Sequence, residues 1–175
     1  ACEGFGLTVP PLANTTVGAL RAFLPASGSV GNPVDMLATA SADDYARAIP
    51  LMLADPGIDS LLTIFIPPLV TDPAEAAHAI TESARDSAKP VLATFFGASG
   101  VPEILAPVPC YTFPESAARA LAHAVTYAAH RRTPVGTVPA VPDINSTLAR
   151  AIVGPARAHG GGWLSPVSCD ALLHA

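Results

Sequence analysis

Residues 67–72 join an apolar run to a helical pattern, and they form the segment of this sequence best suited to bind an anion. Backbone N–H groups at the start of a helix have no partner within the helix, and the helix dipole favours negative charge there. The alternative is an ordinary strand-to-helix turn, because Pro67 and Pro68 lack the N–H groups that a phosphate-binding loop uses. The candidate lining residues are Leu69, Val70, Thr71 and Asp72.

A second polar segment has the sequence Asn32-Pro33-Val34-Asp35. Pro33 keeps Asn32 out of the α region, so the segment is expected to be short and extended. Ligands of parallel α/β sheets lie beyond the carboxyl ends of the strands, and Asn32 and Asp35 are therefore candidates for lining the same crevice. An equally supported alternative is a turn in which both side chains bond their own backbone.

The remaining residues predict neither a catalytic group nor a metal site. The five histidines do not cluster and show no H-x-x-x-H spacing, which a helical metal site would need. The segment Gly97-Ala98-Ser99-Gly100 lacks the last glycine of the G-x-S-x-G nucleophile elbow. No pair of carboxylates stands out as an acid–base couple. The local sequence therefore predicts a binding scaffold without a complete catalytic apparatus.

These segments are positioned by short apolar runs that alternate with alanine-rich helical patterns. Strands are expected at 7–9, 61–66, 90–96 and 108–113, and helices at 14–24, 41–54, 72–87 and 115–130. Asn14, Ser41 and Asp72 are the expected helix caps. Strands alternating with helices predict an α/β fold, a three-layer sandwich with a mostly parallel, doubly wound sheet. A proline-rich linker follows at 133–142, and then two short helices capped by Asp143 and Ser165.

The composition excludes several classes of protein. Charged residues make up 13% of the 175 residues, and the net charge is -5 with Lys89 as the single lysine, which argues against a nucleic-acid partner. The longest apolar run, 61–70, is too short to span a membrane. Three separated cysteines, Cys2, Cys110 and Cys169, fit a reducing compartment, so a cytoplasmic protein is expected. The low charge also predicts a surface that is buried against other domains.

Four blocks of the sequence resemble the NDP-forming acyl-CoA synthetases, which are related to succinyl-CoA synthetase and include the ADP-forming acetate–CoA ligases. They are Gly31-Asn32-Pro33-Val34-Asp35, Ala54-Asp55-Pro56, the segment 67–73 after its strand, and Lys89-Pro90-Val91-Leu92-Ala93. The resemblance covers residues 1–132 and implies the flavodoxin-like ligase domain of such an enzyme. Residues 143–175 resemble the run that leads into the family's ATP-grasp domain.

The resemblance implies an enzyme that makes acyl-CoA from a carboxylate, CoA and ATP through an acyl phosphate and a phosphohistidine. None of the histidines matches the phosphorylated one, so no catalytic residue is expected here. The segment would pack over the transfer site, with the helix that begins near Thr71 aimed at the phosphohistidine, and would be inactive alone. CoA, ATP and magnesium would bind elsewhere in the full enzyme, and the partners would be its CoA-binding, phosphohistidine and ATP-grasp domains or subunits.

Two other classes of function stay open at this stage. One is a regulatory synthetase-like module fused to a lysine acetyltransferase, and the other is a non-catalytic flavodoxin-like interaction domain. Family members carry a further strand before the part that residue 1 matches. If that strand is missing, the strands at 61–66 and 7–9 should flank an unoccupied strand position in the sheet. The expected result is low stability of the domain, or a homodimer formed through this position.

Overall fold

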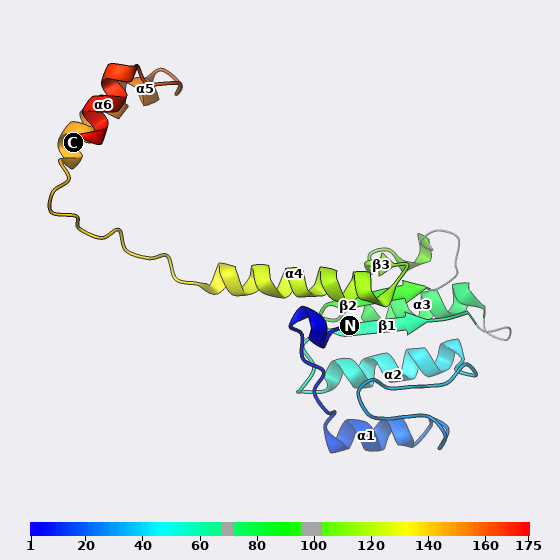
Figure 1. Ribbon diagram of the computed structural model, residues 1–175. Helices are drawn as coiled ribbons and strands as arrows, with labels where there is room; N and C mark the ends of the chain where they lie inside the picture. Colours follow the sequence, from blue (N-terminus) through cyan, green and yellow to red (C-terminus); the bar gives the residue numbers. More distant parts are fainter. Residues whose placement is uncertain (68–71, 96–102) are drawn as a thin grey trace. The chain divides into compact units, whose positions relative to one another are not determined.

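The computed structural model describes residues 1–67, 72–95 and 103–175. The chain divides into two compact units, Ala1–Thr133 and Pro134–Ala175 (Figure 1). Leu69, Val70 and Thr71 of the candidate anion site lie outside the described residues, as do Gly97 to Gly100.

The first unit is built on a parallel sheet with strand order β1-β2-β3 in the part of the chain that is described. The strands are β1 (Leu61–Phe65), β2 (Val91–Phe95) and β3 (Cys110–Tyr111). Leu61 pairs with Val91 and the register continues to the pair of Phe65 with Phe95. Every residue of β2 is buried, as expected for a strand covered on both faces, whereas Ile64 of β1 is exposed. The strands predicted at 61–66 and 90–96 are therefore confirmed, and the strand predicted at 108–113 is reduced to two residues.

The strand predicted at 7–9 is wrong, because these residues form neither a strand nor a bridge. A 3-10 turn, η1 (Glu3–Phe5), precedes them, and Pro10 and Pro11 follow without N–H groups to donate to a ladder. Leu7 instead packs beside Leu62 and Leu92. Within the described residues β1 is an edge strand. The prediction that β1 and a strand at 7–9 flank an empty strand position is therefore met on the β1 side only.

Two helices, α2 (Ala42–Ala54) and α3 (Pro73–Ala84), cover one face of the sheet (Figure 1). The ring of Phe65 lies at the centre of this layer, 5.8 Å from Tyr45 of α2 and 4.8 Å from Phe95, measured between centroids. Each helix of this layer is capped by the residue that directly precedes it. Ser41 caps α2 in a capping box, and Asp72 caps α3, as the sequence predicted.

The opposite face is covered by α4 (Pro114–Arg132). Ala117 and Leu121 of this helix pack on Leu92, and Leu62 and Tyr111 border the contact. A second 3-10 turn, η2 (Glu103–Leu105), lies against α3. Helices on both faces of a parallel sheet make the three layers of an α/β sandwich, which confirms the predicted fold class and is compatible with a flavodoxin-like domain.

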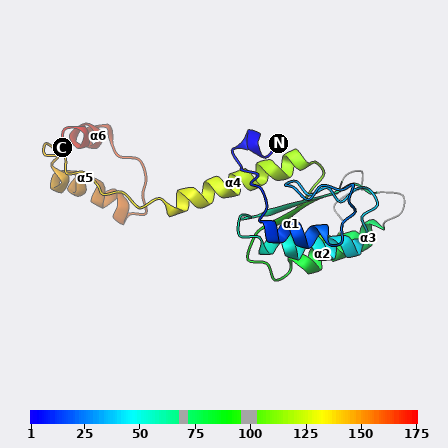
Figure 2. The ribbon, with the colours of Figure 1, turned by 90° about the horizontal axis from the view of Figure 1, so that it is seen from below.

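The shortest helix of the first unit, α1 (Asn14–Arg21), lies beside α2 (Figure 2). Its fully buried Leu20 belongs to an apolar cluster with Ala48 and Met52 of α2. The prediction that Asn14 caps this helix is wrong. The N-cap is Ala13, which has no capping side chain of its own.

The second unit contains α5 (Ser146–Ala158) and α6 (Pro166–Leu173), and neither helix has a buried residue. Ser165 caps α6 as predicted, accepting a hydrogen bond from the Ser168 N–H at 3.1 Å. The prediction that Asp143 caps α5 is wrong, since the Asn145 side chain accepts the Leu148 N–H at 3.0 Å. Residues 134–141 form neither helix nor strand.

Candidate functional site

The carboxyl end of β1 leads into the start of α3, where the sequence predicted an anion site. Asp72 is the first residue described after the gap, and its carboxylate accepts the N–H of Ala74 at 2.8 Å. Its backbone oxygen accepts the N–H of Ala76 at 3.1 Å. Pro73 occupies the first helical position and has no N–H. Part of the donor capacity of this helix end is therefore already used within the chain.

The electrostatics of the same helix end are mixed. Asp72 and Glu75 are both exposed and lie in or next to the first turn of α3. Their negative charges stabilise the helix through its dipole, and they also reduce the attraction of the helix end for a second anion.

Asn32 and Asp35 both bond to the backbone in the structure. The Asn32 side-chain amide donates to the carbonyl of Pro10 at 2.9 Å, and a carboxylate oxygen of Asp35 accepts the N–H of Leu37 at 2.9 Å. The second bond is the local turn bond that the sequence offered as an alternative. A role for these two side chains in lining a ligand crevice stays a prediction.

The loop that carries Asp35 is held closely by its own backbone. Ser29 and Asp35 exchange two backbone hydrogen bonds of 2.8 and 3.0 Å. A Cβ atom on Gly28 would lie 2.7 Å from the carbonyl oxygen of Asp35, and Leu37 has a left-handed φ of 66°. The loop is therefore fixed by close backbone contacts at Gly28 and by a backbone conformation at Leu37 that L-residues rarely adopt.

The sequence analysis missed the role of Asp55, which is 1% exposed at the end of α2. Its carboxylate accepts the N–H of Ala13 at 2.9 Å and the N–H of Gly57 at 2.8 Å. The Thr16 side chain contributes most to lowering the pKa of Asp55, followed by the Gly57 N–H, with smaller contributions from Ala13 and Lys89 and an opposing effect of burial. The Asp-Pro-Gly sequence marks a turn, and nothing local indicates that its carboxylate also binds the N–H of Ala13, the residue before α1.

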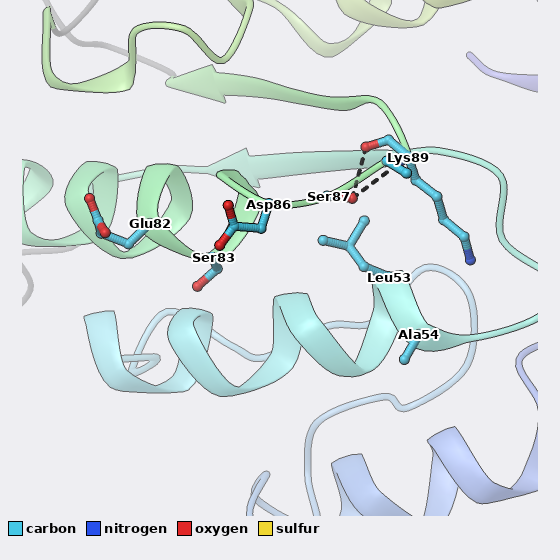
Figure 3. Close-up of a pocket in the computed structure, with 8 residues that line it drawn as sticks. Leu53, Ala54, Glu82, Ser83, Asp86, Ser87 and Lys89 are labelled. Atoms are coloured by element: carbon cyan, nitrogen blue, oxygen red, sulfur yellow. Dashed lines mark hydrogen bonds between the residues drawn. The ribbon is translucent and has the colours of Figure 1, made fainter.

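A depression of about 420 Å³ opens where α2 and α3 end (Figure 3). Its wall includes Glu82 and Asp86, with Lys89 at the start of β2. The Lys89 ammonium donates to the backbone oxygen of Asp55 at 2.7 Å, and Glu82 pairs with Arg85. The depression lies at the amino ends of the strands, so it is separate from the carboxyl edge where ligands of such sheets bind.

The cysteines and the possible metal ligands of the described residues do not form a cluster. The three cysteines are free thiols, and partial burial raises the pKa of Cys110. Among residues 1–67, 72–95 and 103–175, no three His, Cys, Asp or Glu side chains come together in a way that could hold a metal ion. No helix in the described part of the chain has the length and apolarity to cross a membrane.

The fold defines the class of protein, an α/β domain with a parallel sheet and helices on both of its faces. Comparison with known proteins gives the particular family. Residues 1–132 match the Ligase-CoA domain, and the chain belongs to this family, as the sequence blocks indicated.

Two relatives of this chain are ADP-forming acetate–CoA ligases. The chain is 37% identical over 124 residues to the alpha subunit of ADP-forming acetate–CoA ligase II of Pyrococcus furiosus, covering 66% of this chain and 27% of that protein. It is 35% identical over 106 residues to ADP-forming acetate–CoA ligase I of Archaeoglobus fulgidus, covering 59% of this chain and 14% of that protein. The chain thus spans less than a third of either relative.

Two solved structures share the fold. The crystal structure of PH0766 from Pyrococcus horikoshii matches with a TM-score of 0.66 and 31% identity, over 75% of this chain and 32% of that one. The dinucleotide-forming acetyl-coenzyme A synthetase 1 of Candidatus Korarchaeum cryptofilum, in complex with phosphate and ADP, matches with a TM-score of 0.66 and 26% identity. This match covers 74% of the present chain and 29% of the Korarchaeum chain.

Proposed function

We propose that this chain is the part of an ADP-forming acyl-CoA synthetase that packs over the acyl- and phosphoryl-transfer site. The observation that carries the proposal is the match of residues 1–132 to the Ligase-CoA domain, together with the identity to acetate–CoA ligases. The complete enzyme would convert a carboxylate, CoA and ATP into acyl-CoA, ADP and phosphate through an acyl phosphate and a phosphohistidine.

The contribution of this domain would be electrostatic. Leu69, Val70 and Thr71 would present N–H groups, and Thr71 also a hydroxyl, to the phosphoryl group at the start of α3. Preorganised donors aimed at developing charge stabilise a transition state without a chemical step of their own. Asn32 and Asp35 would line the same edge, fixed by their bonds to the backbone of Pro10 and Leu37. Asp72 would act as the helix cap that orients this end.

The cofactors would bind to other parts of the enzyme. The Korarchaeum enzyme whose structure holds ADP and phosphate is more than three times as long as the part matched here, which leaves room for sites of CoA, ATP and magnesium outside this segment. The other domains or subunits of the synthetase would be the partners of this chain. Its three free thiols support a reducing, cytoplasmic location.

The division of the chain supports a further part of the proposal. The first unit ends at Thr133, next to the end of the family match at residue 132. We assign residues 133–142 to a linker and residues 143–175 to a helical lead-in to an ATP-grasp domain.

The proposal is tested by comparing the 175-residue chain with the complete synthetase that contains it. Each is incubated with acetate, CoA and ATP, and acetyl-CoA and ADP are measured. The complete protein is expected to form both products and the isolated chain neither. Turnover by the isolated chain would contradict the assignment of catalysis to other domains, and failure of the complete protein with every short carboxylate tried would contradict the synthetase assignment.

A further inference from the structure

Leu37, in the loop before α2, has a strained backbone. Its φ of 66° lies in the left-handed region, which glycine enters readily and a bulky residue rarely does. Within residues 1–67, 72–95 and 103–175, no other residue except glycine has a positive φ. Its side chain is half-buried and belongs to none of the three apolar clusters of the described residues. Backbone strain of this kind persists where the surrounding structure fixes it, and it is concentrated at functional sites.

The contacts of this loop place Leu37 at the carboxyl edge of the sheet. Its neighbour Met36 packs against the cluster that contains Phe65 and Phe95, the last residues of β1 and β2. The carbonyl of Leu37 accepts the N–H of Ala40 at 3.2 Å, one residue before the N-cap of α2. The strained residue therefore lies where ligands of parallel α/β sheets bind.

The N–H of Leu37 holds the carboxylate of Asp35. It donates to Oδ1 of Asp35 at 2.9 Å, which makes an Asx turn, while the backbone of Asp35 is bonded to Ser29. Asp35 is exposed, and it forms no salt bridge among the residues that the structure describes. Because the chain is anchored on both sides of Leu37, a change in the sign of its φ would rotate the peptide group that carries this N–H and break the bond.

We propose that Leu37 is a positioning residue that acts through Asp35, because its left-handed backbone fixes the direction of this carboxylate at the ligand edge. The proposal rests on the proposed function, in which Asp35 lines the edge at the transfer site. A carboxylate there would accept a hydrogen bond or hold a positive charge. Its fixed direction would spare reorganisation when the site assembles. Turnover would then depend on the backbone of residue 37 rather than on its side chain.

The proposal is tested by replacing Leu37 with glycine and with valine in the complete synthetase. Glycine adopts a positive φ freely, whereas a β-branched residue does so only under strain. We expect kcat to fall about tenfold or more in Leu37→Val and to stay within about twofold in Leu37→Gly, since a misplacement of about 1 Å can cost a hundredfold. The KM for CoA should not change. Leu51→Val, the same substitution at a half-buried leucine of α2, should leave kcat nearly unchanged.

A double substitution tests whether the effect passes through Asp35. Asp35→Ala should lower kcat about as much as Leu37→Val, and adding Leu37→Val to it should change kcat by less than about twofold, because changes that act through one group are not additive. Hydrogen exchange of the residue 37 amide in the 175-residue chain is a readout that does not depend on turnover. The amide should exchange slowly in the wild type and in Leu37→Gly, and fast in Leu37→Val.

Three results would overturn the proposal. An unchanged kcat in Leu37→Val, or a larger loss in Leu37→Gly, would show that the left-handed backbone does not determine turnover. Additive losses in the double variant would show that Leu37 does not act through Asp35. Equal amide exchange in all variants would show that φ does not hold the bond. A wild-type synthetase that turns over no carboxylate would instead contradict the proposed function, and the exchange data would still decide the backbone role.

Discussion

The carboxylate of Asp55 accepts the N–H of Ala13, the N-cap residue of α1, across 42 positions of sequence at 2.9 Å. Asp55 also closes the turn at the end of α2 through Gly57. One buried carboxylate thus fixes the start of one helix and the end of another, and through its backbone oxygen it holds Lys89 before β2. The Ala-Asp-Pro block of the family resemblance acquires a structural role from these contacts.

Replacing Asp55 is expected to destabilise the domain. In Asp55→Ala the N–H groups of Ala13 and Gly57 and the buried Thr16 hydroxyl lose their acceptor, and a buried polar group left without a partner is costly. Thermal unfolding should show a lower Tm than in the control Asp59→Ala, which changes an exposed carboxylate four residues away. Equal Tm values for the two variants would contradict the role given to Asp55.

The same carboxylate predicts an acid-dependent loss of stability. Its pKa is lowered in the folded state by the hydrogen bonds from Thr16, Gly57 and Ala13, so its contribution is fully present above the unfolded pKa and is lost as pH falls through the folded one. Denaturant unfolding of the wild type and Asp55→Ala should therefore differ most near neutral pH and converge below about pH 4. A difference that grows on acidification would contradict this sign.

Two glycines give a matched pair of substitutions with opposite expected effects. Gly28→Ala places a Cβ atom 2.7 Å from the backbone oxygen of Asp35, and overpacking of this kind typically costs about 1–3 kcal/mol. Gly18→Ala meets nothing within 4 Å inside α1, and alanine should stabilise the helix by roughly 0.5–1 kcal/mol. The free energies of unfolding from urea titration check both signs.

The sequence was most informative where the determinants are local. The apolar runs at 61–66 and 90–96 predict β1 and β2, and Ser41 with Asp44 predicts the start of α2, because each pattern is complete within a few residues. The contact between Asp55 and the residue before α1 was missed because Asp55 and Ala13 are distant in sequence. The strand expected at 7–9 failed because an apolar triplet becomes a strand only when a neighbouring strand pairs with it.

For the candidate site, too, features set by a short segment were predicted and features set by tertiary structure were not. The cap at Asp72 follows from one short segment and is present. From the sequence, Asn32 and Asp35 were equally compatible with a ligand crevice and with a local turn. The structure shows their hydrogen bonds to the backbone of Pro10 and Leu37. The convergence of separate loops on one edge depends on tertiary placement, which a residue pattern does not encode.

Within the described residues β1 lies at the edge of the sheet, and this predicts self-association of the isolated chain. No charged residue occurs between Asp59 and Asp72 to protect this edge, and Ile64 is 46% exposed. Unprotected edge strands recruit other strands. Light scattering should show a concentration-dependent dimer, and Ile64→Lys should shift the population towards monomer. A strictly monomeric wild type at all concentrations would contradict this expectation.

Removing the charge of Asp72 tests whether the start of α3 meets an anion. Asparagine caps helices about as well as aspartate, so Asp72→Asn should leave stability nearly unchanged. If a phosphoryl group approaches this end, losing a nearby negative charge should raise kcat of the complete synthetase by about two- to fivefold, the equivalent of about 0.3–1 kcal/mol. A lowered kcat with normal stability would assign Asp72 a different role.

The most direct test of the central claim is Thr71→Glu in the complete synthetase, with His78→Glu on the exposed side of α3 as the control. A carboxylate at residue 71 would repel the transferring phosphoryl group, and losing such a contact typically costs roughly 3–4 kcal/mol, about a hundred- to a thousandfold in kcat. Steady-state kinetics should show this loss for Thr71→Glu alone, with the KM for CoA unchanged in both variants. Near-normal turnover of Thr71→Glu would contradict the claim and leave residues 67–72 as a turn.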